Sequence, residues 1–593
     1  MIRFTNLDYS IIAFIFFVLL SIGLYVSRSA GKNSTHFFLS GKNMPWWLLG
    51  VSMVATTFST DTPNLVTDIV RTNGVSGNWV WWVFLLTGML TVFVYARLWR
   101  ISGVNTDLEF YELRYGGKPA RFLRVFRVLY LGVIFNLITM AGVTLAAIKI
   151  GSVLLGLSPV QTVLIAGSVT LFFSTIGGFK GVVYTDFILF FVAMAGSIAA
   201  AVYVIQMDQV GGMEALLAHP EVHAKLSLFP ETSDTKAWMT LIIIPLAVQW
   251  WSSWYPGAEP GGGGYIAQRM LASKNANHAI GATFFFNVMH YALRPWPWIL
   301  VALASLVVFP DLDSLQAAFP SITPDKLGHD LAYPAMLSLL PSGLLGLVVA
   351  SLAAAYMSTI STQVNWGASY LINDFYAVVF EQEVDEKKRV FWGRIATVVL
   401  LCLSGLLALT LQNALQLFEL LLVFGAGTGL IFILRWFWWR INAWSEISAM
   451  LASGFFSLFL KLTPVGNDLF HPENGFFPDW LQYPIVVLVT TLVWLGVTYL
   501  TPPEDDKTLK NFVQKLELGG PGWTSFSSTN AVKWSVPQGV LAMVLGCVFV
   551  YSILFATGFF IYGEFLWGCL VVLMSVGSGW ALLRMKDTLS KTL

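Results

Sequence analysis

The middle of the second long apolar stretch of the chain reads ATTFSTDTP, at residues 55–63. Pro63 lacks a backbone N–H and its ring clashes with the preceding turn, so this stretch does not support an unbroken helix. In the hydrocarbon of a membrane a helix satisfies its own backbone, and a break is tolerated only where it lines a cavity or an ion site. The carbonyls freed near Ser59 and Thr60, with the hydroxyls beside them, are therefore candidates for such a site.

A second break is predicted in the seventh apolar stretch, which reads YPGAEPGGGG at residues 255–264. Four consecutive glycines and two prolines do not hold a regular helix. A plain loop after a short helix is the alternative, but the apolar pattern resumes at 265–271, which leaves the break inside the membrane profile. Two interrupted segments in corresponding halves indicate a transporter binding site. The two breaks lie five spans apart, the spacing that a five-plus-five inverted repeat would give.

The composition excludes a soluble protein. Hydrophobic residues make up 56% of the chain and charged residues 11%, whereas soluble domains average about 25% charged residues. Lys and Arg (34) nearly balance Asp and Glu (33), so the charge does not indicate a nucleic-acid partner. Cys402, Cys547 and Cys569 all lie in apolar runs, which favours buried or lipid-facing thiols over a disulfide or a metal site.

A membrane span needs about 20 mainly apolar residues, and we identify fifteen candidates. The first is expected to be retained as a helix, because no small-residue cleavage site follows it. Several candidates exceed the minimum length, which implies tilt, breaks or projection beyond the bilayer. The predicted spans are 8–27, 45–70, 76–99, 122–151, 158–176, 182–206, 235–268, 277–309, 333–378, 388–411, 412–438, 444–463, 480–501, 535–558 and 561–583.

The loops between these spans differ in charge. With the N-terminus outside, the basic loops all fall on the inside, whereas 208–234 and 311–330 on the outside are acidic or neutral. This is the positive-inside asymmetry, and the mirror topology would put the basic loops on the wrong side. We therefore expect a multi-pass protein of the cell membrane (plasma or inner) with a cytoplasmic C-terminus. The loops are too short to bury cores of their own, so 1–593 is expected to form one membrane domain.

The ninth span contains AYMSTIST, at residues 355–362. Positions three and four apart share a helix face. Ala355, Ser358 and Thr359 therefore form one oxygen-rich patch, and Ser358, Ser361 and Thr362 form another one turn lower. Hard cations require such oxygen ligands. Hydroxyls in membrane helices also bond the carbonyl four residues back, which is the structural alternative, but four hydroxyls in five residues favour a cation site.

Asp186 lies a few residues into the sixth span. A buried carboxylate in a membrane is costly unless it is paired or coordinated, which makes it a functional candidate. The alternative is a surface carboxylate paired with Lys180.

Several motifs resemble those of the sodium:solute symporter family, which includes the sodium/galactose, sodium/proline and sialic acid symporters. FFLSGK at 37–42, PWW at 45–47 and GVS at 50–52 resemble the opening of the family. Residues 177–186 resemble its GG…V..TD signature, 353–359 its sodium-site helix, and Gln268-Arg269 the pair after its broken helix. The resemblance covers roughly 8–500.

The resemblance implies an all-α integral membrane fold with a LeuT-type five-plus-five inverted repeat and about fifteen transmembrane helices. Residues 8–44 would form an N-terminal extra helix and loop, 45–440 the inverted-repeat core, and 441–593 the C-terminal extra helices.

The resemblance also implies that sodium is the bound ion. Carried over by position, the main sodium site would use three carbonyls and two hydroxyls, those of Ala55, Phe58, Ala355, Ser358 and Thr359. Some members hold a second sodium near an aspartate. The corresponding residues here are Asp186, Ser358, Ser361 and Thr362.

The pattern of the sodium/galactose members is not met. Their glutamate after the first break is replaced by WVWWVF at 79–84, and their glutamine in the eleventh span falls near Leu422. Asn136 does match their asparagine in the fourth span. The Gly-rich break is longer than the family norm and carries Glu259.

Charged residues lie close to the expected solute cavity. Arg294 in the eighth span needs a partner, and either a carboxylate-bearing solute or Glu259 would serve; a structural ion pair is the alternative. Trp250 and Trp251 could stack on a sugar ring or simply pack helices. We expect a sugar or sugar acid, with an amino acid or another organic acid as the alternative. The expected solute-site residues are Asp61, Thr62, Asn136, Gln249, Trp250, Trp251, Glu259, His290 and Arg294.

Three other classes of protein compete with a carrier. A sodium-permeable channel would share broken helices, but channels usually build a pore from repeated subunits or symmetric filters. An enzyme is disfavoured because the sequence has seven histidines and lacks a His/Glu cluster, a Walker loop and a nucleophile elbow. A sensor is disfavoured because we find no signalling domain. We therefore predict a symporter whose partners are sodium, a small solute and the lipid bilayer, with no obligate protein partner.

Overall fold

The computed structural model describes residues 4–30, 39–252, 259–320, 322–380, 386–412, 421–423, 425–470, 475–526 and 534–592. Within these residues the chain is helical, and its one β feature is an isolated bridge between Met44 and Ser273. The prediction of an all-α fold is therefore confirmed for the described residues.

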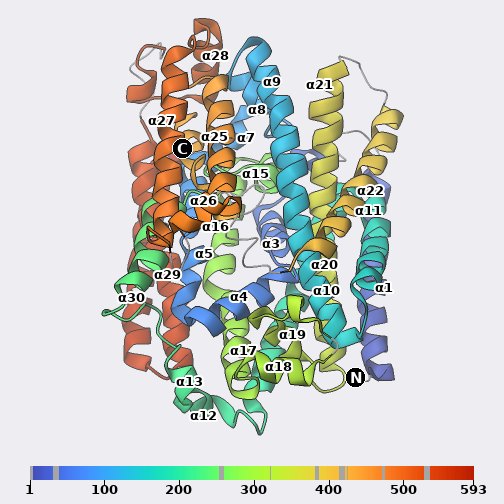
Figure 1. Cartoon of the computed structure of the whole chain (residues 1–593). Helices are drawn as coiled ribbons and strands as arrows, with labels where there is room; N and C mark the ends of the chain where they lie inside the picture. Colours follow the sequence, from blue (N-terminus) through green and yellow to red (C-terminus); the bar gives the residue numbers. More distant parts are fainter. Residues whose placement is uncertain are drawn as a thin grey trace.

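Most of the long helices run side by side (Figure 1). One end of the molecule carries the start of α1 (Asn6–Ala30), with α12 (Gly212–Ala218) and α18 (Leu312–Ala318). The opposite end carries α8 (Glu109–Arg114), α9 (Gly117–Arg127) and α28 (Asp506–Leu516). The acidic and the basic loops thus lie at opposite ends, as their charges predict.

Ten helices among the described residues are long and apolar enough to cross a membrane. Four shorter apolar helices coincide with further predicted spans, and the predicted span 412–438 overlaps residues 413–420, which lie outside the described residues. The ten are Val75–Ser102, Gly117–Leu155, Phe179–Gln206, Ala276–Val308, Leu344–Phe380, Phe391–Thr410, Ala443–Lys461, Asp479–Leu500, Val536–Ile561 and Phe565–Met585. The four are Asn6–Ile22, Trp46–Thr56, Pro159–Phe172 and Thr235–Gln249.

The helix α11 (Pro159–Gln206) contains two predicted spans, 158–176 and 182–206. At 1.5 Å per residue its 48 residues would measure about 72 Å, more than twice the ~30 Å thickness of the hydrocarbon core. That length exceeds a single crossing, and the apolar helices Pro159–Phe172 and Phe179–Gln206 correspond to the two predicted spans.

The first break is real, but it lies upstream of Pro63. Helix α3 (Trp46–Thr56) ends before it and helix α4 (Asp61–Asn73) begins after it, so the non-helical residues are 57–60. Pro63 sits in the first turn of α4, where a missing N–H removes no intrahelical bond. The proline therefore helps to start the second half of the span.

The second break separates η6 (Pro245–Gln249) from α15 (Gly264–Ala272). Residues 255–258 of the predicted break lie outside the described residues, and 259–263 are not helical. Gly261 and Gly262 have φ of 88° and 77°, in the left-handed region that only glycine adopts readily. The glycines are therefore required for the path of the chain.

Helix α20 (Leu344–Tyr370) packs against α3 and α15, and its N-terminus is held by α1. The carboxylate of Asp8 accepts the backbone N–H groups of Gly343 (2.7 Å) and Gly346 (2.9 Å). The first N–H groups of a helix have no partner inside the helix, so Asp8 acts as a cap supplied by another element.

Other elements have the following bounds: η2 (Val75–Asn78), α5 (Trp79–Trp82), α6 (Leu85–Leu90), η3 (Thr91–Tyr95), α7 (Ala96–Ser102), η4 (Val128–Phe135), α10 (Asn136–Leu155), η5 (Trp238–Ile243), α16 (Ala276–Val288), η7 (Met289–Leu293), α17 (Pro295–Val308), η9 (His329–Leu331), α22 (Glu386–Thr410), α24 (Gly429–Leu434), α25 (Ala443–Leu462), α27 (Gln482–Leu500), α29 (Val536–Ile561) and α30 (Phe565–Thr592).

Candidate functional site

The first break touches α20 at Thr359. The Thr359 hydroxyl lies 3.0 Å from the carbonyl oxygen of Thr56 and 3.2 Å from that of Phe58. A hydroxyl has one proton, so it cannot donate fully to both carbonyls at once. Thr359, Phe58, Ala55 and Ala355 are all buried. The structure therefore brings the unwound stretch and the Thr359 turn together, as the sequence predicts.

Ser358 points to a different partner. Its hydroxyl donates to the carboxylate of Asp186, which also accepts from the Ser52 hydroxyl at 2.6 Å. Asp186 is fully buried, and the hydroxyl of Thr56 lies 3.5 Å from it. The carboxylate therefore joins α11, α3 and α20 at the level of the first break.

Arg269 of α15 supplies the positive charge beside Asp186, with 3.4 Å between Nη2 and the carboxylate. Its Nε donates to the Ser52 hydroxyl (2.9 Å) and its Nη2 to the Thr56 hydroxyl (2.8 Å). Because Asp186 is buried and paired with Arg269, the surface pairing with Lys180 does not hold. We did not predict this role for Arg269, although a basic residue directly after the second break is a signal that points to it.

The expected second cation set is only partly assembled around Asp186. Ser358 contacts the carboxylate, whereas the buried Thr362 hydroxyl has no hydrogen-bond partner among the described residues. Ser361 is also buried, one residue before Thr362. Thr362 follows Ser358 by four positions and so shares its helix face. A cation here would compete with Arg269 for the charge of Asp186.

Arg294 contacts the end of α3. Its Nη1 donates to the Val54 carbonyl (3.1 Å) and to the Thr57 hydroxyl (3.2 Å). Its guanidinium also lies over the ring of Trp298, 5.3 Å from the centroid. His290 places Nδ1 3.3 Å from the same Thr57 hydroxyl. A cation at a helix C-terminus is favourable, so Arg294 stabilises the backbone that leads into the first break.

Asp61 and Thr62 form the first turn of α4, on the far side of the first break, and both are half-buried. An acidic residue at a helix N-terminus is favourable. Asp61 also interacts electrostatically with Arg294. The structure therefore gathers Asp61, Thr62, His290 and Arg294 around the first break.

Gln249, Trp250 and Trp251 precede the second break. Gln249 donates to the Val80 carbonyl at 3.0 Å, and Trp251 donates to the Ala426 carbonyl at 3.0 Å. The carbonyl of Trp250 accepts from the Thr87 hydroxyl. These polar groups hold the end of η6 against the third span and the stretch before α24.

The two remaining predicted solute residues lie elsewhere. Glu259 pairs with Arg127 (2.6 Å) and Arg435 (3.3 Å), so of the two alternatives for the partner of Arg294 this structure does not use Glu259. Asn136 donates to the Gln363 carbonyl (2.9 Å) and joins α10 to α20. Each of these side chains bonds residues that are far away along the chain, so the sequence alone could not identify the partners.

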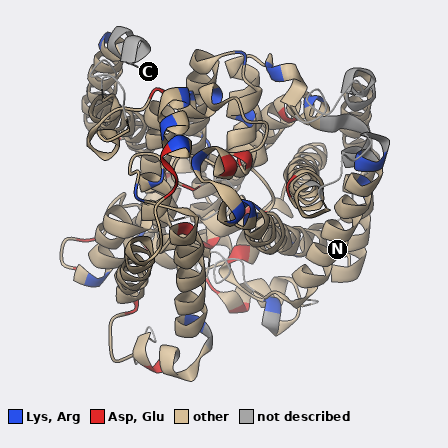
Figure 2. Ribbon diagram, turned by 90° about the horizontal axis from the view of Figure 1, so that it is seen from above, with Lys and Arg blue, Asp and Glu red and all other residues tan. Residues whose placement is uncertain are grey.

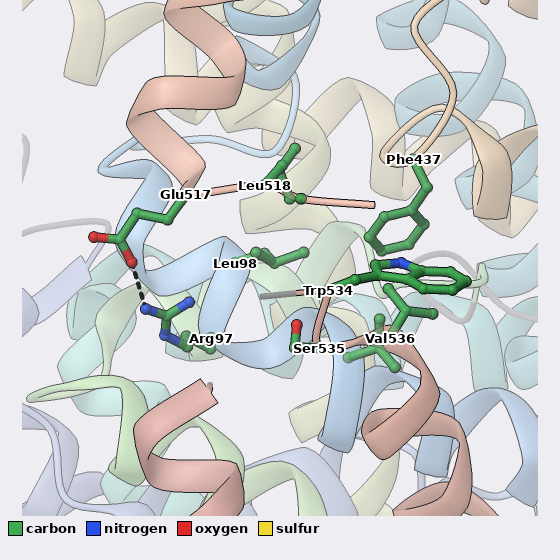
Figure 3. A pocket seen from close by; sticks show the side chains of 10 residues that line it. Arg97, Leu98, Phe437, Glu517, Leu518, Trp534, Ser535 and Val536 are labelled. Atoms are coloured by element: carbon green, nitrogen blue, oxygen red, sulfur yellow. Dashed lines mark hydrogen bonds and ion pairs between the residues drawn. The ribbon is translucent and has the colours of Figure 1, made fainter. Parts of the chain in front are cut away.

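A pocket lies at the end of the molecule that carries α28 (Figure 3). Arg97 and Glu517 form an ion pair of 2.6 Å at its edge, and Trp534 and Phe437 lie at its opposite side. None of the residues that line it belongs to either break, so it is separate from the site described above.

Comparisons with known proteins indicate the family of the chain. A sequence profile of the sodium:solute symporter family matches residues 37–453. A sodium/glucose cotransporter of Vibrio parahaemolyticus is 26% identical over 517 residues, which cover 84% of this chain and 92% of that protein. A sodium/mannose cotransporter of Bos taurus is 24% identical over 597 residues, 93% and 96% of the two chains.

The fold is also similar to that of a solved structure. A Na⁺-coupled sialic acid symporter in a substrate-bound, outward-open state superimposes with a TM-score of 0.65 at 19% identity. The match covers 85% of this chain and 99% of that chain.

Proposed function

The chain belongs to the sodium:solute symporter family, and we propose that it imports a sugar or a sugar acid together with sodium by alternating access. Sodium is the coupling ion of the family. The observation that carries the proposal is the contact between the Thr359 hydroxyl and the carbonyls of Thr56 and Phe58. It places an oxygen-lined point between a broken helix and a continuous one.

Sodium would bind where the first break meets α20, with the carbonyls of Ala55, Phe58 and Ala355 and the hydroxyls of Ser358 and Thr359 as ligands. A bound ion would hold α3 and α4 in one position relative to α20. The solute would then bind between the two breaks, near Arg294 and Trp250. Each ligand binds more tightly when the other is present, and this coupling free energy is reciprocal.

A second sodium at Asp186 is part of the proposal for stoichiometry. The buried Thr362 hydroxyl supports it, because it has no hydrogen-bond partner within the described part of the chain, whereas the Arg269 contact with Asp186 opposes it. Asp186→Asn should lower the number of sodium ions per solute if the second ion binds there. An unchanged stoichiometry would assign Asp186 to the pairing with Arg269 alone.

We propose the following architecture. Fifteen spans contain a five-plus-five inverted repeat within 45–440, flanked by the N-terminal helix at 8–44 and the C-terminal helices at 441–593. The N-terminus would lie outside and the C-terminus in the cytoplasm. The charge difference between the two ends of the molecule supports this orientation.

A sugar is favoured over other solutes because curated relatives are sodium/glucose and sodium/mannose cotransporters. A sugar acid is favoured by Arg294 near the first break, whose charge would suit a carboxylate. An amino acid or another organic acid is the second candidate, for the same reason.

The test is uptake into proteoliposomes with an inward sodium gradient. The panel comprises glucose, mannose, galactose, sialic acid and proline, each measured with sodium and with choline in its place. We expect sodium-dependent accumulation of one sugar or sugar acid, and charge movement per solute separates neutral from anionic cargo. Equal uptake in choline would contradict sodium coupling, and accumulation of proline alone would favour the second candidate.

A further inference from the structure

Four charged side chains form a buried cluster at the end of the molecule that carries α8, α9 and α28. Glu259 Oε2 lies 2.6 Å from Arg127 Nη2, and Glu259 Oε1 lies 3.3 Å from Arg435 Nη2. Arg435 Nη1 lies 3.2 Å from the carboxylate of Glu446. All four side chains are at most 4% exposed. We call these residues the Glu259 cluster.

The cluster joins elements that are far apart in the sequence. Glu259 belongs to the second break, Arg127 ends α9, Arg435 follows α24, and Glu446 lies in the first turn of α25. Seen from this end of the molecule, basic and acidic segments lie side by side near its centre (Figure 2). The second break is therefore tied through Glu259 to two helices that are not its neighbours in the chain.

Tyr111 of α8 and Tyr115, the residue after α8, add hydrogen bonds to the cluster. Arg435 Nη1 donates to the Tyr111 hydroxyl at 2.8 Å, and the Tyr115 hydroxyl donates to Glu446. Two carboxylates face two guanidiniums, so the charges balance. A buried ion pair is tolerated when its geometry and its additional hydrogen bonds compensate for lost hydration. These contacts provide part of that compensation while the cluster stays closed, since Arg127 Nε and Arg435 Nε have no hydrogen-bond partner among the described residues.

The glycines of the second break bring Glu259 into this position. The Gly262 N–H bonds the Glu259 carbonyl at 2.8 Å and closes a tight turn. A Cβ on Gly263 would lie 2.7 Å from Glu259 Oε1. Glycine at 263 therefore lets the carboxylate lie against the backbone of its own turn.

Helix α15 connects the cluster to the candidate sodium site. At its start, the Gly264 N–H donates to Asp107 at 2.7 Å, and Asp107 also accepts from the Tyr370 hydroxyl at the end of α20. Near its other end, Arg269 contacts Asp186 and Ser52. A displacement of α15 would therefore disturb both the Glu259 cluster and the contacts around Asp186.

We propose that the Glu259 cluster is the cytoplasmic gate of this transporter, with Glu259 as the residue that holds the second broken helix closed. The proposal rests on the proposed function, because a gate has meaning only in a carrier that alternates its access. Opening toward the cytoplasm separates Glu259 from Arg127 and Arg435 and lets water hydrate the separated charges. The closed cluster therefore favours the state in which sodium binds from outside.

This assignment predicts an effect on sodium binding at a distance. The apparent affinity for a ligand is proportional to the fraction of molecules in the binding-competent state. Weakening the cluster lowers the fraction of molecules that are closed toward the cytoplasm. The affinity for sodium should then fall, although none of the four side chains is a proposed sodium ligand.

The experiment is a sodium titration of the full chain in nanodiscs. Two readouts monitor it: the thermal unfolding temperature and the rate of deuterium exchange at 264–272. Choline chloride keeps the ionic strength constant. Glu259→Gln is compared with Glu517→Gln, which removes the carboxylate of the exposed Arg97–Glu517 pair at the same end (Figure 3). We expect the sodium midpoint of Glu259→Gln to rise about three-fold or more, with faster exchange at 264–272 in the absence of sodium. Glu517→Gln should behave as the unmodified chain.

A second variant separates gating from folding. Glu259→Gln alone leaves Arg127 without its buried partner, whereas Arg127→Gln combined with Glu259→Gln removes both charges of the pair. Protection of 536–561, in α29, reports whether each variant is folded. An unchanged sodium midpoint and unchanged exchange in the folded double variant would overturn the proposal. If the unmodified chain itself shows no response to sodium, the proposed function fails instead.

Discussion

Thr359 is the single side chain on which the candidate sodium site most depends. Its hydroxyl is the α20 group that contacts the carbonyls of the first break. We expect Thr359→Ala to raise the sodium concentration at half-maximal uptake by about ten-fold, equivalent to ~1.4 kcal/mol. The matched control is Ser351→Ala on the same helix, because the Ser351 hydroxyl bonds the Val348 carbonyl of its own helix. An equal effect of the two substitutions would remove Thr359 from the site.

Arg294 is predicted to act on sodium binding as well as on the solute. It bonds Val54 and Thr57, which flank the proposed ligand Ala55. Arg294→Gln removes a charged hydrogen-bond donor from buried acceptors, and we expect it to cost about 2 kcal/mol of stability. Arg294→Lys keeps the charge but loses the planar guanidinium with its paired N–H donors, so this variant should retain part of the sodium response. Thermal unfolding with and without sodium measures both effects, and identical behaviour of the two variants would contradict this role.

At the scale of elements, the capping of α20 by α1 should be visible in stability. Asp8→Ala leaves the Gly343 and Gly346 N–H groups without their acceptor. The loss of a helix cap typically costs about 1 kcal/mol, and the thermal unfolding temperature should fall accordingly. Ser10→Ala provides the control, because the Ser10 hydroxyl is exposed and bonds Asn6 of its own helix. An unfolding temperature equal to that of the control would show that α1 contributes no cap.

The breaks of two helices were predictable because their causes are local. Proline and consecutive glycines act on the backbone wherever they occur, although the first break lies one turn before Pro63 because a proline is tolerated in a first turn. The partners of the charged residues were not predictable. Asp186 and Arg269 are 83 residues apart and Glu259 and Arg435 are 176 apart, so only the packing of the helices brings them together. The role of Glu259 was missed for this reason.

At the scale of the whole molecule, the two ends are closed by different chemistry. The end with α8 and α9 is held by the Glu259 cluster. At the opposite end, the loop at 328–331 joins α4 to α10, because Arg71 donates to His329 Nδ1 at 3.2 Å and Lys149 pairs with Asp330 at 2.5 Å. Sequence reasoning could predict the separation of basic and acidic loops, but it could not predict which residues close each end.

The contact between Arg71 and His329 makes the second of these ends sensitive to pH. His329 accepts a hydrogen bond at Nδ1, so its imidazole must be neutral. Burial lowers the pKa of His329 below 6.5, and the positive charges of Arg71 and Lys225 lower it further, although Asp330 raises it. The stability from this contact is therefore complete above pH 6.5 and is lost as the pH falls through the lower pKa of the folded protein.

We therefore expect the thermal unfolding temperature to fall between neutral and mildly acidic pH, and we expect His329→Gln to reduce that fall. Glutamine can still accept the Arg71 N–H and does not titrate, so the variant keeps the hydrogen bond while it removes the proton. His223→Gln is the control, because His223 is exposed in α13 (Pro220–His223) at the same end of the molecule. If the His329 and His223 variants lose stability equally on acidification, the pH dependence arises elsewhere. If His329→Gln alone reduces the fall of the unfolding temperature with pH, the pH dependence arises at the contact between α4 and the loop at 328–331.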